Sequence, residues 1–320
     1  MEIPIVSVVC ITYNHELYIR ECMDGFIMQK TNFPFEILIH DDASTDATAS
    51  IIKEYEKKYP DIIRAVYQAE NQYSKGINPG IEHLFPNAKG KYIALCEGDD
   101  YWTDPYKLQK QVDFLETHLE HNLCSHRFKI YDEDLKGWAE AIPQPLMPDS
   151  ANGVEFDFRK MLEVWHAQTM TMLFRRDALD SFDMLQYPNF CDFHLCYHLL
   201  KGKKGYCLNI DAAVYRLHGG GVFSKQSIES KTYLSYYIIK NLYIHNQNDS
   251  VVANNFYANR KDFFENYLRL TIYKKKESKI FLREASLYLK EEYASNGFID
   301  VFLSLRKMLL SFIKSWKRKS

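Results

Sequence analysis

The sequence predicts an α/β protein: a mostly parallel sheet flanked by helices, followed by a C-terminal helical extension. Two observations predict the sheet. Continuous apolar runs suit strands that are buried on both faces, and these runs alternate with amphipathic segments through the first hundred residues. A third observation predicts the extension, because residues 225–320 contain no proline, little glycine and many Tyr, Phe, Leu and Lys residues.

The four strands of the first hundred residues are the clearest elements. They are expected at Ile5–Ile11, Phe35–His40, Ile62–Tyr67 and Lys91–Cys96. Helical segments separate the first three, at lengths that allow right-handed crossovers between parallel strands. The carboxyl ends of parallel strands meet at one edge of a sheet, and ligands bind beyond that edge.

The helices have recognisable starts and stops. Asn14 is expected to cap a helix that runs to about Gln29, and Ser44 is expected to cap a second helix that Pro60 ends. Later segments are expected as a helix after Pro105, a strand over MTMLF (170–174), a helix starting within Asn189–His194 and a strand that leads into His218.

Size and composition exclude several classes of protein. The 320 residues are 46% hydrophobic, enough for a substantial core, and the net charge of -2 provides no basic field for nucleic acid. The N-terminus lacks the basic start and long apolar stretch of a signal peptide, and no apolar run reaches the ~20 residues of a membrane span. Seven scattered cysteines without a Cys-x-x-Cys pair indicate reduced thiols. A cytoplasmic location is therefore expected.

An acidic cluster after the fourth strand carries the strongest chemical signal. In Glu97-Gly98-Asp99-Asp100, several carboxylates repel one another unless a cation neutralises them. Hard oxygen ligands beside a diphosphate suit Mg²⁺ or Mn²⁺. The alternative is an acidic surface turn. A second acidic pair, Asp41-Asp42, falls at the same sheet edge and favours a metal site.

Four stretches in order identify a family. VSVVCITYNHELYI, EILIHDDASTDAT, GKYIALCEGDDYWTDPYKLQKQ and AVYRLHGGGVFS resemble family-2 glycosyltransferases of the GT-A fold, which are inverting enzymes, here of the bacterial surface-polysaccharide type. The resemblance covers about Ile5 to Ser224. It implies a catalytic domain over residues 1–222, with a nucleotide-sugar donor half (1–101) and an acceptor half (102–222). Residues 223–320 then form a helical region.

The resemblance assigns roles in the donor half. Glu97-Gly98-Asp99 matches the family's Asp-x-Asp motif, in which the last acid binds the metal and the first lies near the donor ribose. Glutamate in the first position is a departure from the family, which leaves the ribose contact open. Asp99 is therefore the expected metal ligand, and Asp100 replaces it if the register shifts by one.

The nucleobase is expected beside the first two strands. Asp42 matches the family residue that reads the base, and a carboxylate there accepts the imide N–H of uracil. Tyr13 can stack on the base, with Thr12 and Asn14 nearby. Two alternatives stay open: Asp41-Asp42 can simply cap the following helix, and Tyr13 can belong to the core.

The acceptor half must supply a general base and a further phosphate or metal contact. Asp192 matches the family's catalytic aspartate, although a helix N-cap role is the alternative. His218 matches a residue that completes the metal shell or contacts the diphosphate, and Arg216 can hold phosphate oxygens. A plain glycine-rich turn is the alternative for both. A zinc site at Cys191, His194 and His198 is also conceivable by helical spacing.

Acceptor contacts and membrane attachment are less defined. Gln168 and Thr169 lie in a segment that lines the acceptor cleft in the family, and Trp102 and Trp165 can stack on a sugar or belong to the core. The stretch Phe298–Trp316 has apolar residues at helical spacing, and six basic residues lie within Arg306–Lys319. This pattern fits a helix on an anionic membrane surface or one packed on the catalytic domain.

The predicted function follows from these assignments. We expect a Mn²⁺- or Mg²⁺-dependent inverting glycosyltransferase that moves a hexosyl or N-acetylhexosaminyl group from a nucleoside-diphosphate sugar, most simply UDP-linked, to a glycan or lipid-linked glycan. Capsule or O-antigen synthesis is the expected context. Two alternatives are an inactive sugar-nucleotide-binding partner subunit and a nucleotidyltransferase that makes sugar nucleotides. The second usually needs a glycine-rich loop near the first strand, which ITYNHELY lacks.

Overall fold

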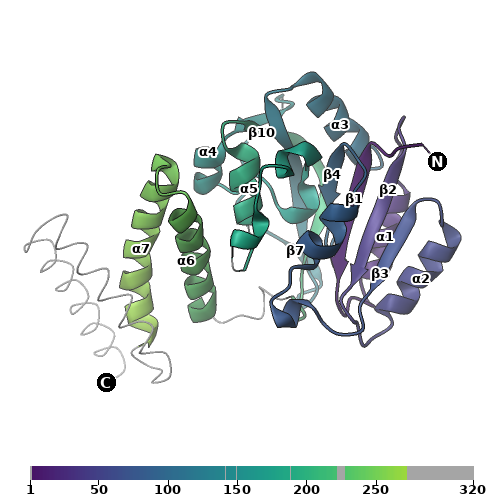
Figure 1. Ribbon diagram of the computed structural model, residues 1–320, viewed down its shortest axis with the longest axis horizontal. Helices are drawn as coiled ribbons and strands as arrows, with labels where there is room; N and C mark the ends of the chain where they lie inside the picture. Colours follow the sequence, from purple (N-terminus) through teal and green to yellow (C-terminus); the bar gives the residue numbers. More distant parts are fainter. Residues whose placement is uncertain (1, 141, 149, 188, 222–227, 272–320) are drawn as a thin grey trace, which may run out of the picture. The chain divides into compact units, whose positions relative to one another are not determined.

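The computed structural model describes residues 2–140, 142–148, 150–187, 189–221 and 228–271. The chain divides into two compact units, residues 1–219 and residues 220–320. The expected boundary was residue 222. The first unit contains the sheet, and the second contains the helices α6 and α7 (Figure 1).

Four parallel strands form the first half of the sheet. β1 (Val6–Thr12) lies between β2 (Phe35–Asp41) and β4 (Tyr92–Leu95), and β3 (Ile63–Tyr67) lies at the outer edge beside β2. The register pairs Thr12 with Asp41, so both strands end at the same level. This half confirms the parallel arrangement that the apolar runs predicted.

Three helices cover one face of these strands. They are α1 (Ile19–Ile27), α2 (Thr48–Lys58) and α3 (Lys107–Thr117), and each buries an apolar stripe. Alternate strand residues face them, because successive side chains of a strand point to opposite sides. The shared core includes Val6, Val8, Cys10, Ile37, Ile39, Ala94, Met23, Phe26, Ile52, Leu108 and Val112.

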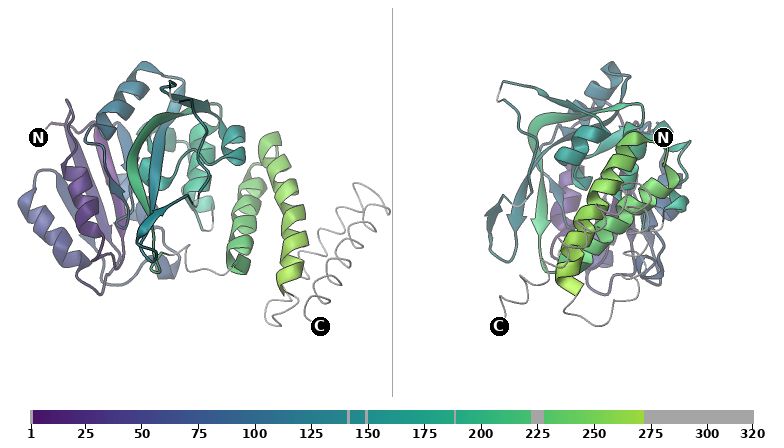
Figure 2. Two further views of the ribbon diagram at one scale, coloured as in Figure 1. Left: turned by 180° about the vertical axis from the view of Figure 1, so that it is seen from behind. Right: turned by 90° about the vertical axis from the view of Figure 1, so that its left-hand side faces the viewer.

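The second half of the sheet is mixed. β9 (Leu173–Arg175) lies between β4 and β6 (His121–Asp132) and is antiparallel to both. β6 runs parallel to the long strand β10 (Lys204–Leu217), and the two lie side by side (Figure 2). Three short strands add to this half by antiparallel pairing: β5 (Tyr101–Trp102), β7 (Gly137–Ala139) and β8 (Gly153–Phe156).

Helices α4 (Phe158–Glu163) and α5 (Asp192–Leu200) complete the first unit. The expected strand over MTMLF is wrong in its first half, because Thr169–Thr171 forms a 3-10 turn before β9 begins. The result is a GT-A-like fold with a curled, mixed sheet. The antiparallel strands β5, β7 and β8 escaped prediction because they are only two to four residues long and carry no clear periodicity.

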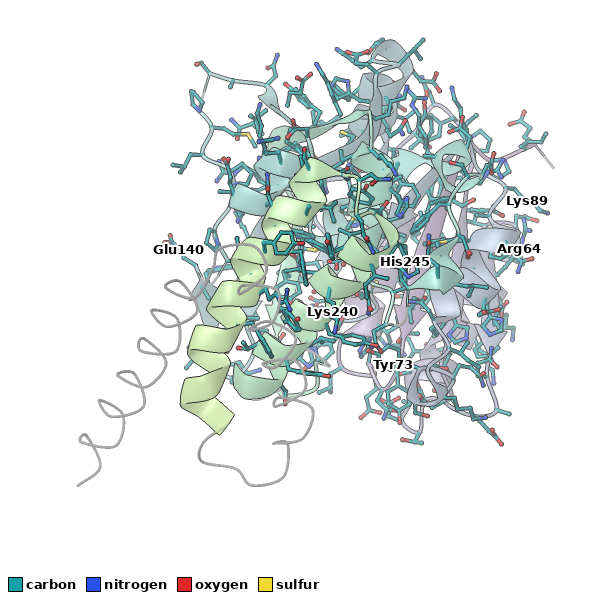
Figure 3. All side chains as sticks on the ribbon, turned by 60° about the vertical axis from the view of Figure 1, so that its left-hand side comes forward. Arg64, Tyr73, Lys89, Glu140, Lys240 and His245 are labelled. Carbon is teal, nitrogen blue, oxygen red and sulfur yellow. The ribbon has the colours of Figure 1, made fainter. Side chains whose placement is uncertain are left out.

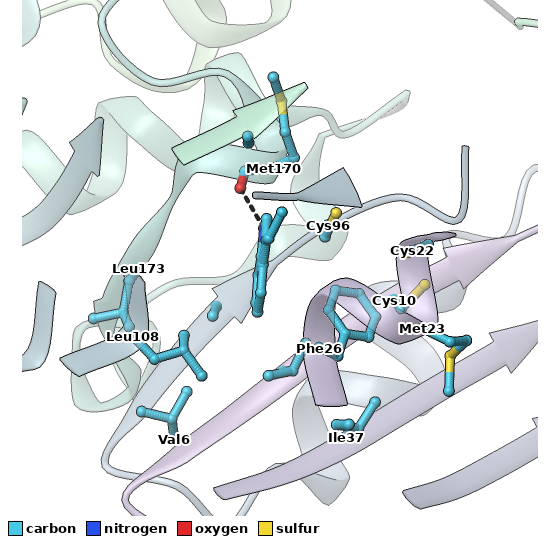
Figure 4. Close-up of a cluster of buried hydrophobic side chains, with 14 of the residues drawn as sticks. Val6, Cys10, Cys22, Met23, Phe26, Ile37, Cys96, Leu108, Met170 and Leu173 are labelled. Carbon is cyan, nitrogen blue, oxygen red and sulfur yellow. Dashed lines mark hydrogen bonds between the residues drawn. The ribbon is translucent and has the colours of Figure 1, made fainter. Parts of the chain in front are cut away.

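The joint between the two halves is tightly packed. Trp102 on β5 is 1% exposed, and its indole N–H donates to the carbonyl of Met170 at 2.8 Å (Figure 4). Gly25 on α1 lies directly against Trp102, where an added Cβ would come within 2.9 Å of the Trp102 main-chain nitrogen. The approach of α1 to β5 therefore depends on glycine at this position.

In the second unit, α6 (Ile228–His245) packs on α7 (Ser250–Thr271) through aromatic pairs. Tyr236 stacks on Phe263 and Tyr243 stacks on Phe256, with ring centroids 4.2 and 4.4 Å apart. Lys240 and His245 of α6 are marked in Figure 3. Within the described part of the chain, none of the helices has the length and hydropathy needed to span a bilayer. The stretch Phe298–Trp316 lies outside the described residues.

Both predicted helix caps are wrong. α1 starts at Ile19 and α2 starts at Thr48, and neither N-cap residue has a side-chain capping bond. Asn14 and Ser44 instead join the two loops: the Asn14 N–H donates to Ser44 Oγ at 2.9 Å. A sequence pattern for a cap does not distinguish a bond within one loop from a bond between two loops.

Candidate functional site

The carboxyl ends of β1, β2 and β4 form one continuous edge. At its centre, the carbonyl of Thr12 accepts the N–H of Asp42 at 3.0 Å, and the carbonyl of Ile11 accepts the N–H of Gly98 at 3.0 Å. The two acidic turns therefore flank the end of β1. The Thr12 hydroxyl is buried there without a hydrogen-bond partner among the described residues.

Gly98 allows the second acidic turn to approach β1. A Cβ at this position would lie 2.8 Å from Thr12 Cβ and Oγ1 and 2.9 Å from His15 Nδ1, closer than real Cβ contacts. Any other residue would push the turn away from the β1 edge. Gly98 is therefore a steric requirement of the site.

The two loops beside this edge hold one another. The N–H of Thr45 donates to Asn14 Oδ1 at 2.8 Å, and the N–H of His15 donates to Thr48 Oγ1 at 2.8 Å. Asn14 and Ala43 both adopt left-handed backbone conformations, with φ of 55° and 61°. For alanine this conformation costs about 1–2 kcal/mol, and such strain is concentrated at functional sites.

Asp99 lies between two imidazoles. Its Oδ2 is 3.1 Å from His218 Nε2 and 3.6 Å from His15 Nε2. Burial by itself would raise the pKa of the Asp99 carboxyl, but the His218 hydrogen bond and the two nearby imidazoles outweigh it and keep the pKa below its ordinary value. Burial lowers the pKa of His15 despite the charge of Asp99, which favours the neutral, ligand-competent imidazole.

Glu97 and Asp192 share the same neighbourhood although they are 95 positions apart. Burial, together with the charges of Asp99 and Asp192, raises the pKa of Glu97 to about 8. Burial also raises the pKa of Asp192. The hydroxyl of Tyr215 has a raised pKa through burial and the charges of these same carboxyls. Bringing these carboxyls together in a buried place therefore disfavours the charged forms of Glu97 and Asp192.

Asp192 is the first residue of α5, where Cys191 is the N-cap residue. The N-cap alternative for Asp192 is therefore wrong. Its Oδ1 accepts the N–H of Phe193 at 2.8 Å, which orients the carboxylate. The ring of Phe193 in turn stacks on the ring of Trp165, which is only partly buried.

Asp100 and Arg216 form an internal pair behind Asp99. Asp100 is 1% exposed, and its Oδ1 accepts the main-chain N–H of Arg216 at 2.8 Å. Burial and the charges of Asp99 and Glu97 raise the pKa of Asp100 well above its ordinary value. The guanidinium of Arg216 bonds to Glu21, Glu133 and the carbonyl of Asp99. It is thus fully engaged with protein groups.

The first acidic turn is held by main-chain donors. The two carboxylate oxygens of Asp42 accept the N–H groups of Gln72 and Tyr73, at 2.7 and 3.0 Å. Asp41 accepts the N–H of Ser44 at 3.2 Å, and its second oxygen is buried without a partner among the described residues. The exposed Tyr73 is labelled in Figure 3.

The remaining sequence-predicted residues fall into two groups. Tyr13 is 43% exposed, so the core alternative for it is wrong. Gln168 and Thr169 are partly exposed. Trp102 is enclosed in the core and has no surface to offer an acceptor, so that assignment is corrected in favour of the core alternative.

The zinc alternative finds no support. His198 Nε2 is 2.9 Å from the hydroxyl of Tyr187, and its ring stacks on Phe182 with centroids 3.6 Å apart. Cys191 Sγ is 3.5 Å from His194 Nδ1, within the turn that starts α5. Over the described part of the chain, no group of three or more His, Cys, Asp or Glu side chains is arranged to hold a metal ion by protein ligands alone, and this includes Asp99 with its two imidazoles.

Sequence reasoning missed His15, Tyr18 and Glu21. His15 lies beside Asp99, and the ring of Tyr18 packs on His218 with centroids 4.6 Å apart. All three belong to the NHELYIRE stretch that follows β1. Because these residues follow a strand that ends at the ligand edge, the sequence could have indicated that they lie near the site.

Comparison with known proteins settles the family. The glycosyl transferase family 2 description matches residues 7–182.

The chain belongs to glycosyl transferase family 2.

Among its relatives, the uncharacterized protein Rv1520 of Mycobacterium tuberculosis is 38% identical over 219 residues. The match covers 68% of this chain, and the chain spans about 60% of the length of Rv1520. WfaP of Escherichia coli, named a UDP-Glc:alpha-D-GlcNAc-diphosphoundecaprenol beta-1,3-glucosyltransferase, is 27% identical, with 68% and 79% of the two chains covered.

Solved structures of similar fold hold nucleotide ligands. S. aureus TarS 1-349 in complex with UDP-GlcNAc matches with a TM-score of 0.68 at 17% identity, covering 98% of this chain and 92% of that one. The mannosyltransferase PcManGT from Pyrobaculum calidifontis, in complex with GDP-Man and Mn²⁺, matches with a TM-score of 0.54 at 15% identity, covering 100% and 89%. At these identities the likeness shows the fold.

The residues around Asp99 fit a divalent cation in their chemistry. A carboxylate oxygen with imidazole nitrogens beside it suits Mn²⁺ in particular. Since the protein offers so few ligands here, diphosphate oxygens and water would complete the shell. Asp100 is already bonded to the Arg216 main chain and is less suited to the role.

Proposed function

We propose that this chain transfers a sugar from a nucleoside-diphosphate sugar, with UDP as the nucleotide, to a hydroxyl of a glycan or lipid-linked glycan. One observation carries the proposal: Asp99, between His218 and His15, lies at the sheet edge that also holds Thr12 and the Asp41-Asp42 turn. UDP-GlcNAc bound to TarS and the UDP-Glc donor in the name of WfaP support the choice of nucleotide.

The donor is proposed to lie along this edge. Tyr13 is exposed and free to stack on the base, and the buried Asp41 oxygen and Thr12 hydroxyl offer polar contacts beside it. Asp42 supports the pocket by holding the loop at Gln72 and Tyr73. Glu97 and Gly98 lie next in line, towards the diphosphate end, and Asn14 fixes the loop between the two turns.

Asp99 and His218, with His15 beside them, would hold Mn²⁺ or Mg²⁺. Such a cation stabilises the negative charge that develops on the departing nucleoside diphosphate. Asp192 is proposed to accept the proton of the acceptor hydroxyl, a role that its raised pKa suits. Attack from the face opposite the leaving group gives inversion without a covalent enzyme intermediate.

The acceptor is proposed to bind near Asp192, at Gln168, Thr169 and the Trp165 ring. A lipid-linked acceptor is supported by the diphosphoundecaprenol-linked acceptor in the name of WfaP. Capsule or O-antigen synthesis and attachment to a membrane through residues 298–320 belong to the same proposal.

Donor binding and turnover test the proposal separately. UDP at a hundredfold excess over its Kd should stabilise the protein by about 2.7 kcal/mol in Mn²⁺ and by much less in EDTA, measured by thermal shift. UDP release from UDP-sugars to water should fall about 10²-fold in Asp192→Asn, with UDP binding unchanged. Binding without any UDP release would support an inactive partner subunit, and pyrophosphate-dependent formation of a nucleoside triphosphate would support a nucleotidyltransferase.

A further inference from the structure

Arg216 is the most heavily bonded side chain near the candidate metal site. It is 4% exposed, near the end of β10 and two residues before His218. Its Nη1 donates to the carbonyl of Asp99 at 2.6 Å, its Nε lies 3.2 Å from Glu133 Oε1, and its Nη2 pairs with Glu21. The guanidinium centre lies 4.3 Å from the ring centroid of Tyr101 and 5.2 Å from that of Tyr18.

These contacts join four segments at one point. Glu21 belongs to α1, Asp99 follows β4, Glu133 follows β6 and Arg216 itself belongs to β10. The main chain is fixed as well, because the N–H of Arg216 donates to Asp100 and the N–H of Glu133 donates to the carbonyl of Leu217 at 2.8 Å. One side chain therefore fixes both the Asp99 turn and the strand end that carries His218.

The oxygens around the Arg216 guanidinium leave it little capacity to bind a phosphate. Each nitrogen of the guanidinium already faces a carboxylate or carbonyl oxygen, and the side chain is only 3% exposed, so a diphosphate has little access to it. The planar fork of arginine suits several fixed acceptors at once, which a lysine ammonium does not.

We propose that Arg216 is a positioning residue which, with Glu21 and Glu133, holds His218 against Asp99, and that it does not bind the donor's phosphates. This inference rests on the proposed function, since it concerns the same cation and donor site. If Arg216 has this role, the positions of the metal ligands depend on α1 and on the β6–β7 hairpin. These segments are far apart in sequence.

Two binding measurements separate positioning from phosphate binding. Arg216→Gln should weaken the Mn²⁺-dependent part of UDP binding by about tenfold or more, because His218 and Asp99 lose their shared support. UDP binding in EDTA should stay unchanged, because no phosphate contact is lost. The affinity of the Arg216→Gln protein for Mn²⁺ in the absence of nucleotide should fall by a similar factor, measured by EPR of free Mn²⁺. Arg216→Lys should recover only part of the loss.

Glu133→Gln distinguishes the two roles of Arg216 directly. It also keeps the inference testable if the Arg216→Gln protein does not fold. If Arg216 positions His218, this change weakens Mn²⁺-dependent UDP binding. If Arg216 binds phosphate, releasing it from Glu133 leaves UDP binding unchanged or tighter, which overturns the inference. An equal loss of UDP affinity with Mn²⁺ and in EDTA for Arg216→Gln also overturns it.

Arg175→Gln is the matched control. Arg175 is likewise a partly buried arginine with main-chain partners, donating to the carbonyls of His121 and Leu115, but it pairs with Tyr92 at the opposite end of β4. It should lower the melting temperature without changing Mn²⁺ or UDP affinity. Wild-type protein that fails to bind UDP with Mn²⁺ contradicts the proposed function itself. Wild-type binding with unaffected Arg216→Gln and Glu133→Gln variants contradicts only the role of Arg216.

Discussion

Two acidic turns flank the end of β1, and they differ in what surrounds their carboxylates. In the Asp41-Asp42 turn, the carboxylates accept hydrogen bonds from the main-chain N–H groups of Ser44, Gln72 and Tyr73. In the Glu97–Asp100 turn, burial and the neighbouring carboxylates raise the pKa of Glu97 and Asp100, and the Asp99 carboxylate lies beside the imidazoles of His218 and His15.

This difference shows that acid content at a ligand edge does not by itself define a metal site. A carboxylate that is satisfied by main-chain donors stabilises the fold. A group of buried carboxylates, in which Glu97 and Asp100 have raised pKa values, has an electrostatic reason to bind a cation. The two turns therefore have separate expected roles: the first shapes the pocket, and the second performs the chemistry.

The largest expected effect is the difference between one substitution in each turn, Asp99→Ala and Asp42→Ala. Asp99→Ala should lower turnover by about 10³-fold while the protein remains folded, because the substitution removes the central ligand of the cation and also relieves repulsion. Asp42→Ala should instead lower the free energy of unfolding by about 1–3 kcal/mol, because the N–H donors of Gln72 and Tyr73 both lose their acceptor. UDP release and urea unfolding measure the two outcomes. Full turnover in Asp99→Ala contradicts the assignment of the second turn.

A smaller effect is expected from the backbone of the second turn. Gly98→Ala places a Cβ 2.8 Å from Thr12 and should destabilise the protein by about 1–3 kcal/mol. The displaced turn should weaken Mn²⁺-dependent UDP binding by about tenfold. Gly137→Ala is the control, because an added Cβ there would come no closer than 3.9 Å to a neighbouring atom, the carbonyl oxygen of Leu135. Equal behaviour of the two variants would show that the close approach to β1 is unnecessary.

A third expected effect is a pH dependence of stability that involves the second turn. The pKa of Glu97 is about 8 in the folded protein, against about 4.3 for an unfolded glutamate. Between these values the native state holds a proton that the unfolded chain releases. The free energy of unfolding in EDTA should therefore fall as the pH rises from about 5 to 8, by at most about 1.4 kcal/mol per pH unit.

Glu97→Gln should flatten this slope, because the amide does not titrate. Urea unfolding at a series of pH values gives the measurement. An unchanged slope in the variant would assign the pH dependence to other groups and weaken the contrast between the turns.

The parallel half of the fold was predictable because its information is local. The apolar runs that became β1, β2, β3 and β4 are continuous, and each is long enough to show its periodicity. Short antiparallel strands such as β5 and β8 were missed because pairing partners, and not their own residues, make them strands.

The sequence by itself determined where the parallel strands lie along the chain and that acids follow their carboxyl ends. Only the tertiary structure decided which acids keep an unbalanced charge. That outcome depends on donors far along the chain: Asp42 meets the N–H of Gln72, 30 residues away, and Asp99 meets His218, 119 residues away. Hydrogen bonds and electrostatic interactions act over a few ångströms, so the fold, and not the spacing in sequence, selects their partners.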